Sequence, residues 1–311
     1  MATAGVFPKA TGDTIYLADY NAIQTIVANV LGTGSGPATL SSQAGYGQTV
    51  SSSQIAAGTA ITASQMQNLK TDLDKISYHQ TFSASTAPSI SAGGTISYSE
   101  WNTYKTQADT LNTNRFALSA NQATATEGVA PTFANWNGLR THTVTVTFAD
   151  AANARYFFNA GGEIRIVPSH STIGASGDYL IKGNFWSSLF TTVGTVKFGY
   201  TNTTANVTGS SIGWYSLTSS PQQVFLYTSA ATYIGNIFSI DASCNVANNS
   251  TGTASVLTLS IKYNDAGYAS SGLNNFDEYV GGTTTSLIQH YRATGSNVQV
   301  NAPTIATTGA P

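Results

Sequence analysis

The sequence predicts an α+β protein of more than one domain, with a helical N-terminal region built from short repeats and an all-β domain of sandwich or jelly-roll type behind it. Three observations predict this. The chain has 311 residues, more than a typical single domain. Three segments in its first third align without a gap. From about residue 141 onward, apolar and polar residues alternate as they do in half-buried strands.

The three aligned segments each begin with a glycine, at Gly12, Gly58 and Gly93, and carry an isoleucine three positions later. Apolar residues then recur at 3-4-3 spacing, which is one face of an amphipathic helix. We therefore expect one helix per segment, with N-caps at Asp19, Ser64 and Ser99. The expected apolar faces comprise Tyr20, Ile23, Val27, Val30, Met66, Leu69, Leu73, Ile76, Trp101, Tyr104 and Leu111.

The partner of these apolar faces is open at this point, because periodicity defines a face and not what covers it. The faces form either the core of a three-helix domain or a contact between subunits. Connectors rich in Gly, Ser, Thr and Ala separate the segments and are longer than those of a tight bundle. On the second alternative, the eleven residues are candidates for an assembly interface.

Three regions follow along the chain: a helical region at 1–117, a joint at 118–140 and a β domain at 141–311. In the first expected strand, Val144, Val146 and Phe148 share one face while threonines occupy the other. Two short helices are expected at 150–158 and 184–190. Further strands, with turn residues between them, are expected at 162–167, 194–200, 222–227, 233–240, 255–263, 284–291 and 298–300.

Composition limits the classes of function. Charged residues make up 8% of the chain, against about 25% in typical soluble proteins. With 41% hydrophobic residues and a net charge of −2, the chain has a core, and its surface must be covered by uncharged polar residues. Such a surface opposes association only weakly, so permanent assembly suits it. The 12 Lys and Arg residues are scattered, and no apolar run reaches about 18 residues, so neither a nucleic-acid partner nor a membrane span is expected.

Motifs for chemistry are weak. The single cysteine, Cys244, excludes an intramolecular disulfide and a CxxC site. Gly209, Ser211 and Gly213 match the G-x-S-x-G pattern, but the strand-turn-helix context of a nucleophile elbow is missing. Metal-ligand spacing is absent among His79, His142, His170 and His290. No acid/base pair stands out among Asp150, Glu163, Asp265, Asp277 and Glu278. We therefore expect a protein that is not an enzyme and has no metal or cofactor.

Several stretches together resemble virion structural proteins of marine and cyanobacterial T4-like phages. The most specific is Arg155-Tyr-Phe-Phe-Asn-Ala-Gly-Gly-Glu-Ile-Arg165. Shorter ones include Ala18-Asp-Tyr-Asn21, Gly45-Tyr-Gly-Gln48, Gly194-Thr-Val-Lys-Phe-Gly199 and Tyr291-Arg-Ala-Thr-Gly295. The likeness covers nearly the whole chain, and it supplies no catalytic residues.

The resemblance implies a component of a phage particle, in its tail, fibres or neck. The N-terminus shows no secretion signal, so the chain is expected to be made in the host cytoplasm and to end in the virion. Its partners would be further copies of itself, with a trimer expected for a fibre-like part, and other virion proteins. The alternative is a module that decorates the capsid or binds host-surface glycans, through exposed aromatics such as Tyr215, Tyr233 or Tyr268.

Overall fold

The computed structural model describes residues 7–33, 45–229, 235–248, 251–265 and 279–308. Within these ranges the chain is a mixed α+β protein with five α-helices and eleven strands in two antiparallel sheets. It divides into two compact units. We call residues 1–124, 155–162 and 292–301 the helical unit, and residues 125–154, 163–291 and 302–311 the β unit.

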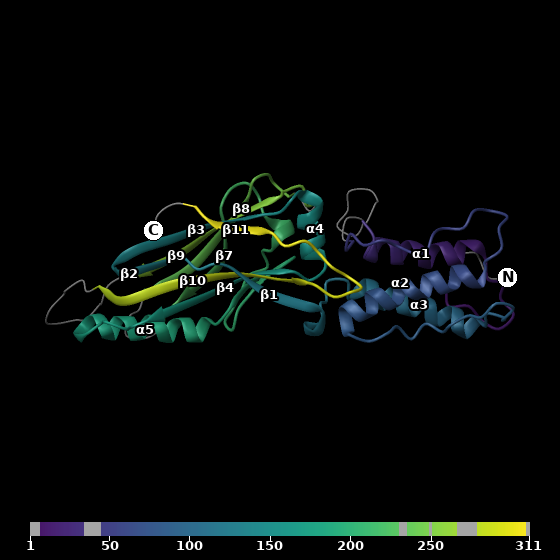
Figure 1. Cartoon of the computed structure of the whole chain (residues 1–311), viewed down its shortest axis with the longest axis horizontal. Coiled ribbons are helices and arrows are strands. Elements are labelled where there is room, and N and C mark those ends of the chain that lie inside the picture. Colours follow the sequence, from purple (N-terminus) through teal and green to yellow (C-terminus); the bar gives the residue numbers. More distant parts are fainter. Residues whose placement is uncertain (1–6, 34–44, 230–234, 249–250, 266–278, 309–311) are drawn as a thin grey trace. The chain divides into compact units, whose positions relative to one another are not determined.

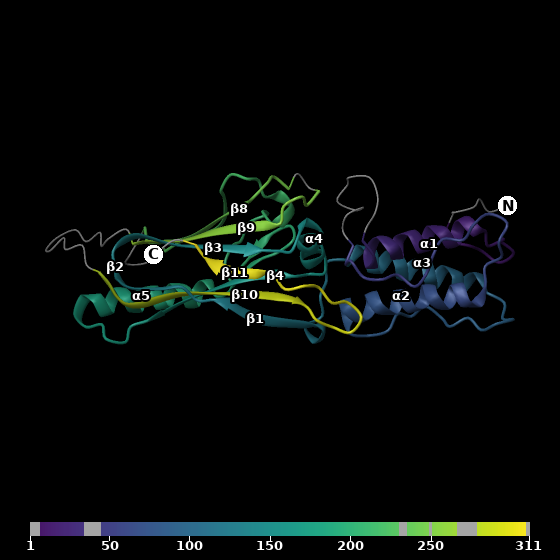
Figure 2. The same cartoon turned by 45° about the horizontal axis from the view of Figure 1, so that its top comes forward.

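The helical unit contains three helices that run in the same direction: α1 (Leu17–Leu31), α2 (Ala63–Thr81) and α3 (Tyr98–Thr113). At their first turns, the Tyr20 hydroxyl donates to the Gln65 carbonyl at 3.3 Å. At their last turns, Gln80 Nε2 donates to the Leu111 carbonyl at 2.8 Å. Both views show the three helices side by side (Figures 1 and 2). The parallel arrangement explains the long connectors, because each must return along the full length of a helix.

Each helix begins five residues after the glycine of its segment. At Gly12, Gly58 and Gly93 the φ angles are +89°, +84° and +76°, in the left-handed region that favours glycine. A turn of the same kind therefore precedes each helix.

The expected N-caps Asp19, Ser64 and Ser99 were wrong by two or three residues, because each helix starts earlier. The backbone N–H of each observed cap donates to the side chain three residues later, as in a capping box. These pairs are Tyr16–Asp19 at 2.7 Å, Thr62–Gln65 at 2.7 Å and Ser97–Glu100 at 2.8 Å.

The β unit is a sandwich-like pair of sheets (Figure 1). The first sheet has the order β1 (Ala123–Val129), β10 (Val280–Ala293), β4 (Glu163–Ser171), β5 (Val196–Phe198) and β6 (Thr203–Thr204), and β2 (Thr132–Trp136) also pairs with β10. The second has the order β11 (Thr304–Thr307), β3 (Gly138–Thr147), β9 (Val256–Asp265), β8 (Ile237–Cys244) and β7 (Gln222–Thr228).

Aromatic side chains fill the space between the two sheets. Trp136 of β2 and Tyr263 of β9 lie with ring centroids 6.2 Å apart, and both side chains have no exposed surface. The helix α5 (Gly177–Val193) joins the same cluster, because Trp186 lies 4.9 Å from Trp136 and Phe190 lies 5.7 Å from Tyr263. Burial of such large rings stabilises the β unit.

Several elements differ from the sequence-based expectation. The helix expected at 184–190 is the longer α5, whereas the one expected at 150–158 matches α4 (Ala151–Asn159). The range expected to be a joint contains β1 and β2. No strand forms at 298–300, where Gln299 makes only an isolated bridge to Thr294. None of the helices in the described ranges is long and apolar enough to cross a membrane.

Candidate functional site

The eleven candidates for an assembly interface lie inside the helical unit. Their exposed fractions range from 0% to 4% in a single chain. Side chains that are covered within one chain offer no surface to another folded chain. Of the two alternatives, the structure thus places these residues in the unit's own core, so an interface with a partner would have to use other side chains.

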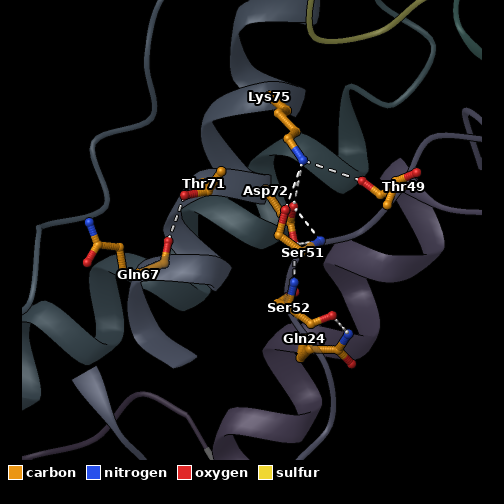
Figure 3. Close-up of polar contacts among 8 residues, drawn as sticks. All are labelled: Gln24, Thr49, Ser51, Ser52, Gln67, Thr71, Asp72 and Lys75. Atoms are coloured by element: carbon orange, nitrogen blue, oxygen red, sulfur yellow. Dashed lines mark hydrogen bonds and ion pairs between the residues drawn. The ribbon is translucent and has the colours of Figure 1, made fainter. Parts of the chain in front are cut away.

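Asp72 anchors the connector that returns from α1 to α2. Its carboxylate has no exposed surface and accepts hydrogen bonds from the backbone N–H groups of Ser51, at 2.9 and 3.0 Å, and Ser52, at 2.7 Å. Lys75 Nζ lies 3.3 Å from the same carboxylate (Figure 3). Gln24 Nε2 of α1 donates to the Ser52 carbonyl at 3.3 Å. Side chains of α1 and α2 therefore hold the connector by hydrogen bonds to its backbone.

Two asparagines at equivalent positions of their segments make a second kind of tie. Asn21, nine residues after Gly12, bonds both the N–H and the C=O of Ile55 at 2.9 and 3.0 Å. Asn102, nine residues after Gly93, bonds both backbone groups of Lys9 at 2.8 Å. In each case the bound residue lies three positions before the glycine of another segment. These contacts join the segments around the helices, and they hold no exposed reactive group.

A buried polar link connects the two sheets of the β unit. His142 Nδ1 of β3 lies 2.8 Å from Ser286 Oγ of β10, and the Tyr263 hydroxyl is also hydrogen-bonded to Ser286. A serine beside a histidine is the arrangement of an activated nucleophile. Ser286 has no exposed surface, however, so no substrate reaches its hydroxyl. His142 and Ser286 therefore form a structural hydrogen bond between the two sheets.

Burial of two histidines makes the stability of the protein dependent on pH. Burial lowers the pKa of His79, in the helical unit, and of His142, in the β unit, to about 4. A histidine in the unfolded chain has a pKa of about 6.5. Below that pH the unfolded chain therefore binds protons at these histidines that the folded chain does not bind. The contribution is complete above about pH 6.5 and is lost as the pH falls toward 4, by about 1.4 kcal/mol per pH unit and histidine.

We accordingly expect the free energy of unfolding, measured with urea, to fall steeply between pH 6.5 and pH 4.5. Replacement of one buried histidine, His142→Gln, should reduce the slope by the equivalent of about one proton. The absolute stability of this variant at pH 7.5 is measured alongside, because loss of the bond to Ser286 lowers it independently. An unchanged slope in His142→Gln would show that His142 is protonated equally in both states.

The other candidate groups for chemistry are held in structural contacts. Glu163 pairs with Arg165 at 2.8 Å, and Asp265 pairs with Lys182 at 2.7 Å. Asp150 accepts the Asn153 backbone N–H at 2.7 Å. Asp277 and Glu278 lie outside the described residues. Among the residues that are described, no three His, Cys, Asp or Glu side chains gather in a metal-binding group.

The G-x-S-x-G match forms a turn. Ser210, between Gly209 and Ser211, makes an antiparallel bridge to Thr203. A Cβ on Gly209 would lie 1.9 Å from the Thr203 carbonyl oxygen, so glycine is required there for close approach of two backbones. The pattern reflects backbone packing and gives no nucleophile elbow.

Exposed aromatic rings at Tyr215, Tyr233 or Tyr268 would have supported the glycan-binding alternative. Tyr215 is only 5% exposed and packs against Tyr200, with ring centroids 5.1 Å apart, so it gives that alternative no support. Tyr233 and Tyr268 lie outside the described residues. The β unit instead exposes Tyr179 and Tyr279, at 47% and 52%. Sequence reasoning missed both, because it began α5 at residue 184 and β10 at residue 284.

Tyr179 and Tyr279 line a pocket of about 300 Å³ with Asn135, Gly174, Ala175, Ser176 and Gly281. Their ring centroids lie 6.2 Å apart at an angle of 71°. A second pocket, of about 410 Å³, is lined by residues 129–132 and 141–143, His142 among them, and by Thr307. Of the two, only the tyrosine pocket combines exposed aromatic rings with polar groups, which is the composition typical of ligand sites.

Comparison of the chain with known protein families, with curated proteins and with solved structures found no match.

Proposed function

We propose that the chain is a non-enzymatic structural component of a bacteriophage virion, an oligomeric building block of the tail, fibres or neck. The resemblance of residues 155–165 and of the shorter motifs to phage virion proteins suggests the particle. The surface chemistry is the observation that carries the proposal of assembly. It is independent of the resemblance.

The surface is poorer in free charge than the composition alone indicates. At least seven of the 12 Lys and Arg residues are engaged in ion pairs within the chain, two of them in pairs with no exposed surface. Large apolar side chains are exposed on both units, among them Phe82 and Tyr98 on the helical unit and Leu139, Ile173 and Ile181 on the β unit. Weak charge repulsion together with exposed apolar groups favours association.

We further propose that the helical unit consists of three copies of one turn-helix element. The equal distance from glycine to helix in all three segments supports this, as do the equivalent ties made by Asn21 and Asn102. Three such copies would present similar turns, at Gly12, Gly58 and Gly93, to a partner in the particle. A jelly-roll strand order for the β unit stays a prediction.

The oligomeric state of the full chain tests the proposal. We expect light scattering after size exclusion to give one fixed multiple of 32.4 kDa at every concentration, with three copies for a fibre-like part. Addition of salt should strengthen the oligomer or leave it unchanged, because apolar contacts and not ion pairs would hold it. A monomer throughout the concentration range would contradict a homo-oligomeric building block.

A further inference from the structure

We propose that the pocket between Tyr179 and Tyr279 binds a neutral carbohydrate, with one sugar ring stacked on a tyrosine and a hydroxyl bound by Asn135. This activity goes beyond the proposed structural role and does not depend on it. The pocket lies wholly within the β unit. It combines two exposed rings, one oriented amide and a hydrogen-bonded backbone behind them.

The two tyrosines form a corner that suits the flat, apolar face of a pyranose. Their rings are close to perpendicular, at 71°, and about half of each side chain is exposed. A ligand ring that stacks on one tyrosine therefore has the other tyrosine at its edge. An aromatic ring contributes a large contact area at a small entropic cost, and its hydroxyl stays free to bond to solvent or ligand.

The side-chain amide of Asn135 supplies a directed donor. Its Oδ1 accepts the backbone N–H of Gly282 at 3.1 Å, which fixes the orientation of the amide. No acceptor among the described residues takes a hydrogen bond from its Nδ2. The residue is exposed and has φ of +43°, a conformation that is unfavourable for most side chains but tolerated by asparagine. The NH₂ group is therefore available to a ligand hydroxyl.

A hydrogen bond from His170 fixes the backbone of Gly281, which lines the pocket. His170 Nε2 lies 2.9 Å from the Gly281 carbonyl oxygen, and its Nδ1 lies 2.8 Å from Thr284 Oγ1. The Trp136 indole N–H donates to the same hydroxyl at 3.1 Å. Gly281 has to be glycine, because a Cβ there would lie 2.7 Å from the Cβ of Tyr179. A rigid floor keeps the rings and the amide in place before a ligand arrives, which lowers the entropic cost of binding.

The charge of the pocket selects among ligand classes. The described residues that line it carry no carboxylate, ammonium or guanidinium group. Among these residues a cationic ligand finds no carboxylate to pair with, and an anionic ligand finds no Lys or Arg. The Ser176 hydroxyl adds a second group that both donates and accepts. Two rings, one directed amide and one hydroxyl match a neutral ligand that is apolar on one face and rich in hydroxyls at its edge.

Saturation-transfer NMR on the full-length chain tests the proposal, with the methyl glycosides of glucose, galactose, mannose and N-acetylglucosamine as separate probes. We expect saturation transfer to at least one glycoside, strongest at its ring protons. Tyr179→Ala and Tyr279→Ala should each weaken binding by on the order of tenfold or more. The matched control is Tyr98→Ala, which removes a tyrosine of similar exposure, 44%, from the helical unit and should leave binding unchanged.

Asn135→Asp is the sharpest variant. The aspartate retains an oxygen for the Gly282 N–H but replaces the outward donor by an acceptor, so binding should fall by on the order of tenfold while the melting temperature is maintained. The proposal is overturned if saturation is transferred to none of the four glycosides, or if transfer persists in both tyrosine variants. It is also overturned if the protein binds a polyproline peptide and none of the glycosides. The oligomeric state is read separately, so its outcome does not affect this one.

Discussion

Lys182→Met should destabilise the protein by about 3–5 kcal/mol, the largest effect that we expect from a single substitution. Lys182 Nζ of α5 lies 2.7 Å from Asp265 Oδ2 of β9, and neither side chain has exposed surface. Removal of the lysine leaves a buried carboxylate without its cation. The free energy of unfolding in urea at pH 7.5 measures the loss.

A double variant separates two effects on the free energy of unfolding: the cost of leaving one buried charge unpaired and the net contribution of the ion pair. Lys182→Met with Asp265→Leu should recover most of the stability, since an apolar pair of similar volume replaces a buried ion pair at little net cost. Lys262→Met serves as the control, because Lys262 lies on β9, the strand that carries Asp265. Its pair with Asp241 is partly exposed, with the lysine at 36%, and should contribute less than about 1 kcal/mol. A double variant no more stable than Lys182→Met would contradict the account.

Asp72→Ala should be the second most damaging change, at about 3 kcal/mol. Hydrogen bonds to a charged acceptor contribute about 1.5–3 kcal/mol each, and Asp72 accepts from the backbone of both Ser51 and Ser52. Without the carboxylate the returning connector loses its anchor to α2. We expect faster hydrogen exchange at the amides of Ser51 and Ser52, together with a lower free energy of unfolding.

Asp109→Ala is the matched control for Asp72→Ala. Asp109 also lies on a helix of this unit and pairs with a lysine, Lys105, at 2.6 Å, but its side chain is 52% exposed. Its loss should reduce stability by well under 1 kcal/mol. Equal effects of the two substitutions would mean that the connector is held by its apolar contacts, with no measurable contribution from Asp72.

The helical unit was the most predictable part of the chain. The 3-4-3 spacing after Ile15, Ile61 and Ile96 gave three helices and their buried faces, because a helix that packs on one side must repeat its apolar residues with that period. The same spacing left the partner of the faces open. That the helices run parallel depends on contacts such as those of Asn21 and Asp72 with distant backbone, which no local pattern reveals.

In the β unit, strands with one buried face were predictable and exposed strands were not. The alternation around Val144 gave β3. β1 was taken for part of a joint, because its residues are mostly exposed and its Thr, Ala, Glu and Gly show no apolar alternation. The tyrosine pocket could not be foreseen, since Asn135, Tyr179 and Tyr279 come from three segments that only the fold brings together.

The composition of purified virus particles tests the central claim most directly. Particles released from cells that make this chain are separated on a density gradient, and quantitative mass spectrometry measures its copies relative to the major capsid protein. We expect a fixed ratio, unchanged after further gradients and high salt, that corresponds to a whole number of oligomers per particle. A chain that stays in the soluble fraction, or whose ratio falls with each wash, would contradict a structural role in the virion.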